Sequence, residues 1–229
     1  MKKTKRLKKI AENLDANKQY DLNEGLKLIK DNSTAKFDES IDVVFKLNLD
    51  PKYQDQNIRE VVQMPEGLGK KIKVAVIANS TKHEDASKAG ADYVGADDLV
   101  DEIKKGKTDF DICIATPDMM AKVGQLGKIL GPKGLMPNPK LGTVTQDVAK
   151  AVKNAKNGQV EIKLDKAGIM HTVIGKASFS LEKLGSNFSA LYSAVKSAKP
   201  SGAKGSYIKG LYLSSTQGLS VEISLSSLV

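Results

Sequence analysis

The stretch Val74-Ala-Val-Ile-Ala78 is apolar at every position, and a second mainly apolar run follows at Phe110-Asp-Ile-Cys-Ile-Ala115. Strands that are apolar on both faces are typical of a parallel sheet with helices on either side. Segments with helical character alternate with these strands and with a short candidate strand at Tyr93-Val94, namely 82–89, 98–105, 118–123 and 147–155. Continuous strands that alternate with helices predict βαβ units and therefore a Rossmann-like domain.

The segments on either side of this block have a different pattern. In the run from Ser40 to Leu49, apolar and polar residues alternate, which predicts a strand with one buried face. Asp21 is the candidate N-cap of an amphipathic helix that begins at Leu22. Apolar residues at helical spacing predict a second, long helix over 180–196. Two β-hairpins are predicted, 160–164 with 169–174 and 207–213 with 219–225.

These two patterns predict the domain organisation and the fold class, α/β and α+β. The flanks, 1–66 and 161–229, form one discontinuous α+β domain, and a Rossmann-like parallel-sheet domain of residues 67–160 is inserted in it. The predicted links are Pro65-Glu-Gly-Leu-Gly69 and Asn157-Gly158. Glycine at both crossings would permit a hinge, so we expect the two domains to rock against each other.

The run Gly127-Lys-Ile-Leu-Gly-Pro-Lys-Gly-Leu-Met-Pro-Asn-Pro-Lys-Leu-Gly-Thr143 holds four glycines and three prolines. Glycine permits close approaches of the backbone, and proline fixes turns. Lys128, Lys133 and Lys140 add positive charge, and no acid lies among them. The composition predicts a stiff basic loop.

The charge of the chain favours an anionic partner. The 229 residues carry a net charge of +9, with a pI near 9.3, and nucleic acid is the commonest partner of such a protein. Lysine supplies nearly all of it, because Arg6 and Arg59 are the only arginines. Lysine suits phosphates, whereas bidentate reading of base edges prefers arginine. We therefore expect recognition of RNA shape and backbone.

The basic N-terminus, Lys2 to Lys9, includes Lys5 and contains no acid. It is interpreted as an arm on nucleic acid, or the start of a helix that continues to Leu14; the alternative is a solvated terminus. No apolar h-region follows it, and no apolar run approaches a membrane span. Cys113 is the only cysteine and excludes an internal disulfide, so we expect a cytoplasmic protein with no membrane partner.

The sequence offers no catalytic site. Asn79-Ser-Thr-Lys82 lacks the glycines of a dinucleotide fingerprint, and Gly127-Lys128 is followed by Ile129 instead of the Ser or Thr of a phosphate loop. His83 and His171 stand apart, without neighbouring ligands at metal-binding spacing. We predict a protein that is not an enzyme and that needs no cofactor and no metal.

The segment 127–143, together with Thr145 to Lys156 and Gly168-Ile-Met-His-Thr172, resembles the ribosomal protein L-one family in its bacterial form. The resemblance extends over essentially the whole chain, in order. It implies a component of the large ribosomal subunit that binds the mobile stalk of large-subunit rRNA and assists release of deacylated tRNA from the exit site. It also implies repression of translation through binding of its own mRNA, and a monomer when free of the ribosome.

The resemblance also implies RNA-binding residues at four places in the chain. The first is the corner Ala35-Lys-Phe-Asp-Glu-Ser40, where Lys36 offers a phosphate contact, Phe37 a stacking surface and Ser40 a hydrogen bond. Without the resemblance, the residues of this corner favour a core Phe37 and a solvated Lys36. The second place is Asp50-Pro-Lys-Tyr53, where Lys52 remains but Tyr53 replaces a basic residue of the family.

The third place is the first hairpin, where the resemblance implies RNA-facing roles for Lys163, Asp165 and His171. The fourth is the second hairpin tip, Ser214-Ser-Thr-Gln-Gly218, where Gln217 replaces a methionine of the family and the implied residues are Ser215, Thr216, Gln217 and Gly218. For Lys128, Lys133 and Lys140 two interpretations stand, a second RNA contact and a latch between the domains.

Two other classes of function fit parts of the sequence. A Rossmann-like domain is also typical of nucleotide-dependent enzymes, which would require saturable binding of a nucleotide by residues 67–160. A basic RNA chaperone would bind unrelated folded RNAs equally well. The ribosomal interpretation instead requires preference for one junction-containing RNA.

Overall fold

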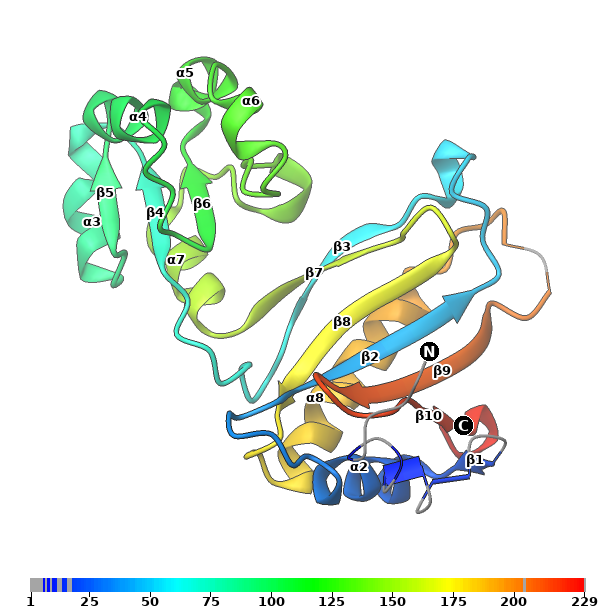
Figure 1. Cartoon of the computed structure of the whole chain (residues 1–229). Coiled ribbons are helices and arrows are strands. Elements are labelled where there is room, and N and C mark those ends of the chain that lie inside the picture. Colours follow the sequence, from blue (N-terminus) through cyan, green and yellow to red (C-terminus); the bar gives the residue numbers. More distant parts are fainter. Residues whose placement is uncertain are drawn as a thin grey trace. The chain divides into compact units, whose positions relative to one another are not determined.

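The computed structural model describes residues 6, 8, 10, 11, 14, 15, 18–203 and 205–228. The chain divides into two compact units, each drawn with its labelled elements in Figure 1. The first unit is discontinuous and comprises Met1–Gly69 and Val160–Val229; the second comprises Lys70–Gln159. The predicted N-terminal arm, Lys5 included, lies outside the described residues except for Arg6 and Lys8.

The discontinuous unit is built on a five-stranded sheet of order β1-β10-β9-β2-β8 and a two-stranded ribbon of β3 and β7. Its strands are β1 (Gln19–Tyr20), β2 (Ser40–Leu47), β3 (Arg59–Gln63), β7 (Gln159–Lys163), β8 (Ile169–Lys176), β9 (Ile208–Ser215) and β10 (Val221–Ile223). Its helices are α2 (Leu22–Asp31) and α8 (Leu181–Ser197), with short 3₁₀ turns at Gln54–Gln56 and Leu225–Leu228. β2 is antiparallel to both of its neighbours, β8 and β9.

One face of this sheet carries the core. Alternate residues of β2, including Ile41, Val43 and Phe45, are fully buried. They pack in one cluster with Leu26 of α2 and Phe188 of α8, so the two helices lie over this face. Because successive side chains of a strand point to opposite faces, the other residues of β2 lie on the open face.

The first predicted hairpin is present only at its turn. Asp165 N–H donates to Ile169 O at 2.8 Å, and the single bridge Leu164–Met170 joins the two arms. Beyond that bridge the arms separate, because β7 pairs with β3 while β8 pairs with β2. β3 was not predicted from the sequence. The predicted partner of the segment 160–164 was therefore 169–174, the strand that follows it in the chain.

Gly168 is required at this turn. It has φ of +74°, and a Cβ atom there would lie 2.8 Å from Leu49 O. We expect Gly168→Ala to lower the free energy of unfolding by about 1–2 kcal/mol, from left-handed strain and the clash with the backbone. Urea unfolding would measure it. The control is Gly185→Ala in α8, where nothing lies within 4 Å of the added Cβ. This change should stabilise by about 0.5–1 kcal/mol, and an equal loss in both variants would contradict the prediction.

The second unit contains a three-stranded parallel sheet of order β5-β4-β6, as the apolar runs predict. Its strands are β4 (Val74–Ile77), β5 (Tyr93–Gly95) and β6 (Ile112–Ala115). Its helices are α3 (His83–Lys88), α4 (Asp97–Lys104), α5 (Met120–Gly124), α6 (Gly127–Leu130) and α7 (Val148–Lys156), with 3₁₀ turns at Ser80–Lys82, Pro117–Met119 and Pro139–Leu141. Cys113 is buried in β6, where burial raises the pKa of its thiol to about 12, so it is an unreactive core residue.

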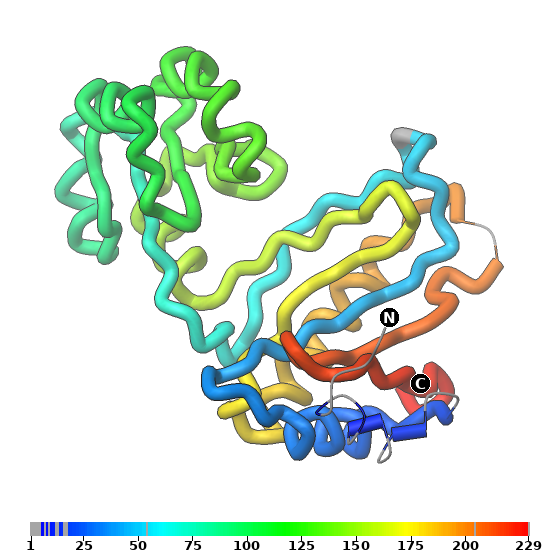
Figure 2. The backbone as a smooth tube through the Cα atoms, viewed as in Figure 1, coloured from blue at the N-terminus to red at the C-terminus, as the bar shows by residue number. Residues whose placement is uncertain are grey.

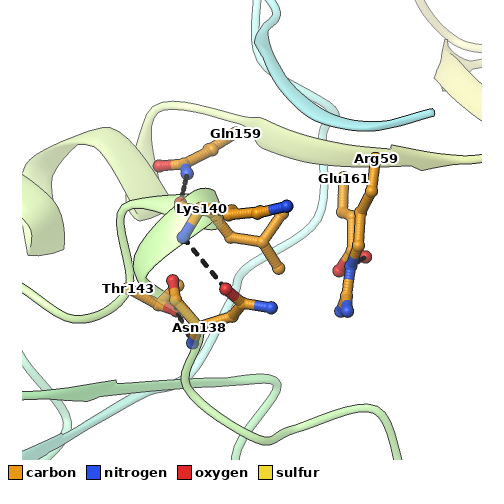
Figure 3. Close-up of polar contacts among 7 residues, drawn as sticks. Arg59, Asn138, Lys140, Thr143, Gln159 and Glu161 are labelled. Atoms are coloured by element: carbon orange, nitrogen blue, oxygen red, sulfur yellow. Dashed lines mark hydrogen bonds and ion pairs between the residues drawn. The ribbon is translucent and has the colours of Figure 1, made fainter. Parts of the chain in front are cut away.

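The Gly- and Pro-rich run is not one continuous loop. It begins as α6 and ends in the 3₁₀ turn, and Val144 after it forms a parallel bridge with Ala115 of β6. Asn138 caps the turn, because its Oδ1 accepts from Lys140 N–H at 2.9 Å (Figure 3). The Thr143 hydroxyl accepts from Asn138 N–H at 2.8 Å. The Gln159 amide donates to Leu141 O at 3.2 Å, so the run is fixed within its own unit.

The predicted fold class is thus confirmed, a discontinuous α+β unit with an inserted parallel α/β unit. The predicted helices and most strands are present. β1 and β3 are additional, and both are edge elements whose partners come from distant parts of the chain.

Candidate nucleic-acid interface

The corner before β2 and the tip after β9 form one surface. Ser40 N–H donates to the Thr216 hydroxyl at 2.9 Å, and Thr216 N–H donates to Ser40 O at 3.0 Å. Figure 2 shows the corner, in blue, beside the orange-red turn between β9 and β10. The two segments are about 176 residues apart in sequence and are brought together by the pairing of β2 with β9. The Thr216 hydroxyl is therefore engaged within the protein.

Glu39 lies beneath this junction and is 1% exposed. Its two carboxylate oxygens accept from Ala35 N–H and from Gln217 N–H, each at 3.0 Å. Burial alone would raise the pKa of this carboxyl, but hydrogen bonds from Gln217, the Ser215 hydroxyl and Ala35 hold it below its ordinary value. The stabilisation from the ionised group is therefore present at neutral pH and is lost as the pH falls through the lowered pKa.

The side chain of Phe37 is exposed to solvent, and the residues that flank it are fixed by hydrogen bonds. Its side chain is 50% exposed, although it lies between fixed residues. Asp38 accepts from the Ser178 hydroxyl at 2.7 Å and from Ser178 N–H at 3.1 Å, and Glu39 is fixed from below. Lys36, the preceding residue, is exposed as well. The core interpretation of Phe37 is thus wrong, and the corner exposes both an aromatic and a lysine side chain.

The tip has an internal reason for its glycine. A Cβ atom at Gly218 would collide with the hydroxyl of Ser215, whose side chain is 4% exposed. Ser215 thus lies under the surface, while Thr216 and Gln217 are exposed. Arg6 donates to Gln217 O, which places this residue of the basic arm at the tip.

The open face of the sheet continues this surface away from the corner. His171 of β8, Val44 of β2 and Tyr212 of β9 are register partners, so they lie in one row across the face. Nearer the corner is Asp42, whose pKa is raised by burial against the opposing effect of the charges of His171 and Lys176. Lys176 Nζ donates to the Ser40 hydroxyl at 2.8 Å. The face therefore combines cationic, aromatic and hydrogen-bonding groups.

The other predicted residues lie at the far end of β2. Lys52 and Tyr53 are exposed on the turn after β2, and Lys163 and Asp165 are exposed around the neighbouring turn, whose Gly168 O accepts from Leu47 N–H. β2 has eight residues, so about 23 Å separates this end from the corner. The structure thus brings corner and tip into contact, places His171 between the two ends, and keeps Lys52, Lys163 and Asp165 at the far end.

The predicted lysines of the second unit lie in its Gly- and Pro-rich run. Lys128, Lys133 and Lys140 are all exposed, and Lys133 donates to the Thr108 hydroxyl. The second RNA contact and the latch both stay predictions.

Sequence reasoning missed three residues of the interface. Glu39 belongs to the corner and accepts from Gln217 N–H of the tip. Lys176 of β8 donates to the Ser40 hydroxyl, and Arg6 donates to Gln217 O of the tip. The predicted strand ended at Ile174, so Lys176 was left out of the face. Glu39 stands directly before the alternating run Ser40 to Leu49, which is only a weak signal. A buried carboxylate cannot be distinguished from a solvated one in a single sequence.

This arrangement suits an extended anionic polymer with stackable bases. Among the described residues, no cluster of three or more His, Cys, Asp or Glu could hold a metal ion. In that same part of the chain, the helices are too short or too polar to cross a membrane. An exposed ring beside lysines can stack on a base and neutralise phosphates, which are the two main sources of affinity for single-stranded or looped RNA.

Comparisons with known proteins found a matching family and similar proteins from two bacteria. The profile of the ribosomal protein L1p/L10e family matches residues 29–219. The large ribosomal subunit protein uL1 of Actinobacillus succinogenes is 52% identical over 227 residues, covering 99% of each chain. The protein of the same name from Rickettsia akari is 51% identical over 224 residues, which are 98% of this chain and 94% of that one.

Proposed function

The chain belongs to the ribosomal protein L1p/L10e family, and from this premise we propose that it is a structural protein of the large ribosomal subunit that binds the rRNA of the mobile stalk. The binding surface would be the corner and tip of the discontinuous unit, continued along the open face of its sheet. The protein would act as a monomer when free and would have no catalytic role.

The observation that carries this proposal is the exposed Phe37 ring on a corner whose backbone is fixed. A ring that is already held in the open loses little conformational freedom when a base or ribose stacks on it. Lys36 would contact a neighbouring phosphate, and Ser40 and Thr216 would bond the sugar–phosphate backbone at the sides that their mutual bonds leave free.

The rest of the surface would extend the contact along the RNA. Lys52 and Lys163 at the far end would neutralise phosphates, and Asp165 would accept hydrogen bonds from exocyclic amines or 2′-hydroxyls. His171, midway, would add a hydrogen bond or a stacking surface. Gln217 would offer an amide where the family offers an apolar side chain.

Repression of translation would use the same surface. An RNA that copies the stalk junction would compete for it, so a messenger with such a structure could be repressed by this protein. The lysines Lys128, Lys133 and Lys140 of the second unit would then be free for exit-site tRNA, whose release the protein would assist.

Titration of the full-length protein against a stalk rRNA fragment and an unrelated folded RNA of equal length would test the proposal. We expect selective binding of the stalk fragment that persists at physiological salt. Three lysines of the surface, Lys36, Lys52 and Lys163, are available for phosphates. The logarithm of the association constant should therefore fall with the logarithm of the salt concentration at a slope of about −2 to −3. Equal, salt-labile binding of both RNAs would indicate a general RNA chaperone instead.

A further inference from the structure

Glu39 is an unusual residue for a surface that is meant to attract phosphates. Among the residues that the structure describes, it is the only acidic or basic side chain in the buried set. Burial of a carboxylate is costly unless its oxygens are hydrogen-bonded. Here both oxygens are used, one on each side of the junction between corner and tip.

The bonds of Glu39 constrain the two segments that carry the proposed RNA contacts. Ala35 N–H, on one oxygen, lies two residues before Phe37, and Glu39 itself lies two residues after it. Gln217 N–H, on the other oxygen, follows Thr216, which is bonded to Ser40. A single carboxylate therefore closes the corner around Phe37 and fixes the tip against it.

We propose that Glu39 is a positioning residue of the RNA-binding surface, which never touches RNA but holds Phe37 and the tip in their binding geometry. The inference rests on the proposed function for its effect on affinity. Its structural part, the closure of the corner by Glu39, can be measured without RNA.

For removal of the Glu39 charge, simple electrostatics and a positioning role predict opposite changes in RNA affinity. Removing a negative charge next to bound phosphates should leave affinity unchanged or improve it. A positioning role predicts weaker binding, because an amide in place of the carboxylate would face two N–H donors with only one acceptor oxygen. The sign of the change in affinity therefore separates the two.

The experiment compares full-length wild type, Glu39→Gln, Phe37→Ala and the double variant for binding to the stalk rRNA fragment. The matched control is Glu182→Gln, an exposed acid at the start of α8, on the helix-covered side of the sheet. We expect Glu39→Gln to bind about 10- to 100-fold more weakly and the control to bind within about twofold of wild type. In the Phe37→Ala background, Glu39→Gln should cost less than about threefold, since its effect passes through that ring.

Amide hydrogen exchange supplies the readout without RNA. The amides of Ala35 and Gln217 should lose protection in Glu39→Gln while those of β2 keep theirs. Should this variant fail to fold, Glu39→Asp keeps the charge but is one methylene shorter, and it should show a smaller loss of the same kind. Unchanged exchange, affinity equal to or above that of wild type, or fully additive losses in the double variant would each overturn the inference. Failure of wild type to prefer the stalk RNA, with exchange altered as expected, would refute the proposed function alone.

Discussion

Replacing Asn187 by alanine should lower the free energy of unfolding of the discontinuous unit by about 3–5 kcal/mol. Asn187 lies in α8 and is fully buried. Its Oδ1 accepts from Glu66 N–H at 3.0 Å, and its Nδ2 donates to Gly67 O at 2.9 Å and to Ile174 O at 2.7 Å. Alanine would leave the buried Ile174 O and the part-buried Glu66 N–H and Gly67 O without this partner, and each buried group left unpaired costs about 1–3 kcal/mol.

Urea unfolding followed by circular dichroism would measure this loss, with the transition of the discontinuous unit analysed separately from that of the second unit. Asn23→Ala is the control, because Asn23 is exposed on α2 and the change should be within about 0.5 kcal/mol of neutral. Hydrogen exchange at Glu66 should increase in Asn187→Ala alone. A loss below about 1 kcal/mol would show that water replaces the side chain in all three bonds.

Replacing Phe37 by alanine should weaken binding of the stalk rRNA fragment by about 1–3 kcal/mol, which corresponds to about 5- to 150-fold. The reason is loss of a stacking surface that the folded protein already presents, half exposed and with its flanking residues fixed. Stability should fall by only about 1 kcal/mol, because the ring is half exposed and loses about half of the burial of a core phenylalanine.

Equilibrium binding at fixed salt would measure the effect of Phe37→Ala, with thermal unfolding of the same samples. The salt dependence should keep its wild-type slope, because no phosphate contact is removed. Leu181→Ala removes another exposed apolar side chain, at the start of α8, and should bind as wild type does. Wild-type affinity in Phe37→Ala would show that the stacking surface lies elsewhere.

Local patterns were sufficient for much of this fold. The continuous apolar pattern of β4 and β6 predicts strands buried on both faces, and the alternating pattern of β2 predicts a strand buried on one face. Such periodicity is a property of a few consecutive residues. The predicted N-cap Asp21 likewise stands at the N-cap position of α2, although its side chain makes no capping hydrogen bond. Short edge strands such as β1 carry no such pattern, because two residues cannot show a period.

The candidate interface was predictable only through resemblance. Phe37, Lys36, Thr216 and His171 were named from motifs, and nothing in the residues themselves separated an exposed Phe37 from a buried one. The sequence also did not show that β7 and β8 pair with different strands on either side of their connecting turn. The reason is that strand pairing depends on partners far away in the chain.

The sequence by itself determined the alternation of elements, the two kinds of sheet, the excess of lysine and the family. The tertiary structure alone decided which backbone groups meet. It placed the Glu39 carboxylate between Ala35 and Gln217, left Phe37 in the open and used the Thr216 hydroxyl inside the protein. The physical reason is that periodicity and capping are local, whereas burial of a charge and closure of a hydrogen bond depend on segments that only folding brings together.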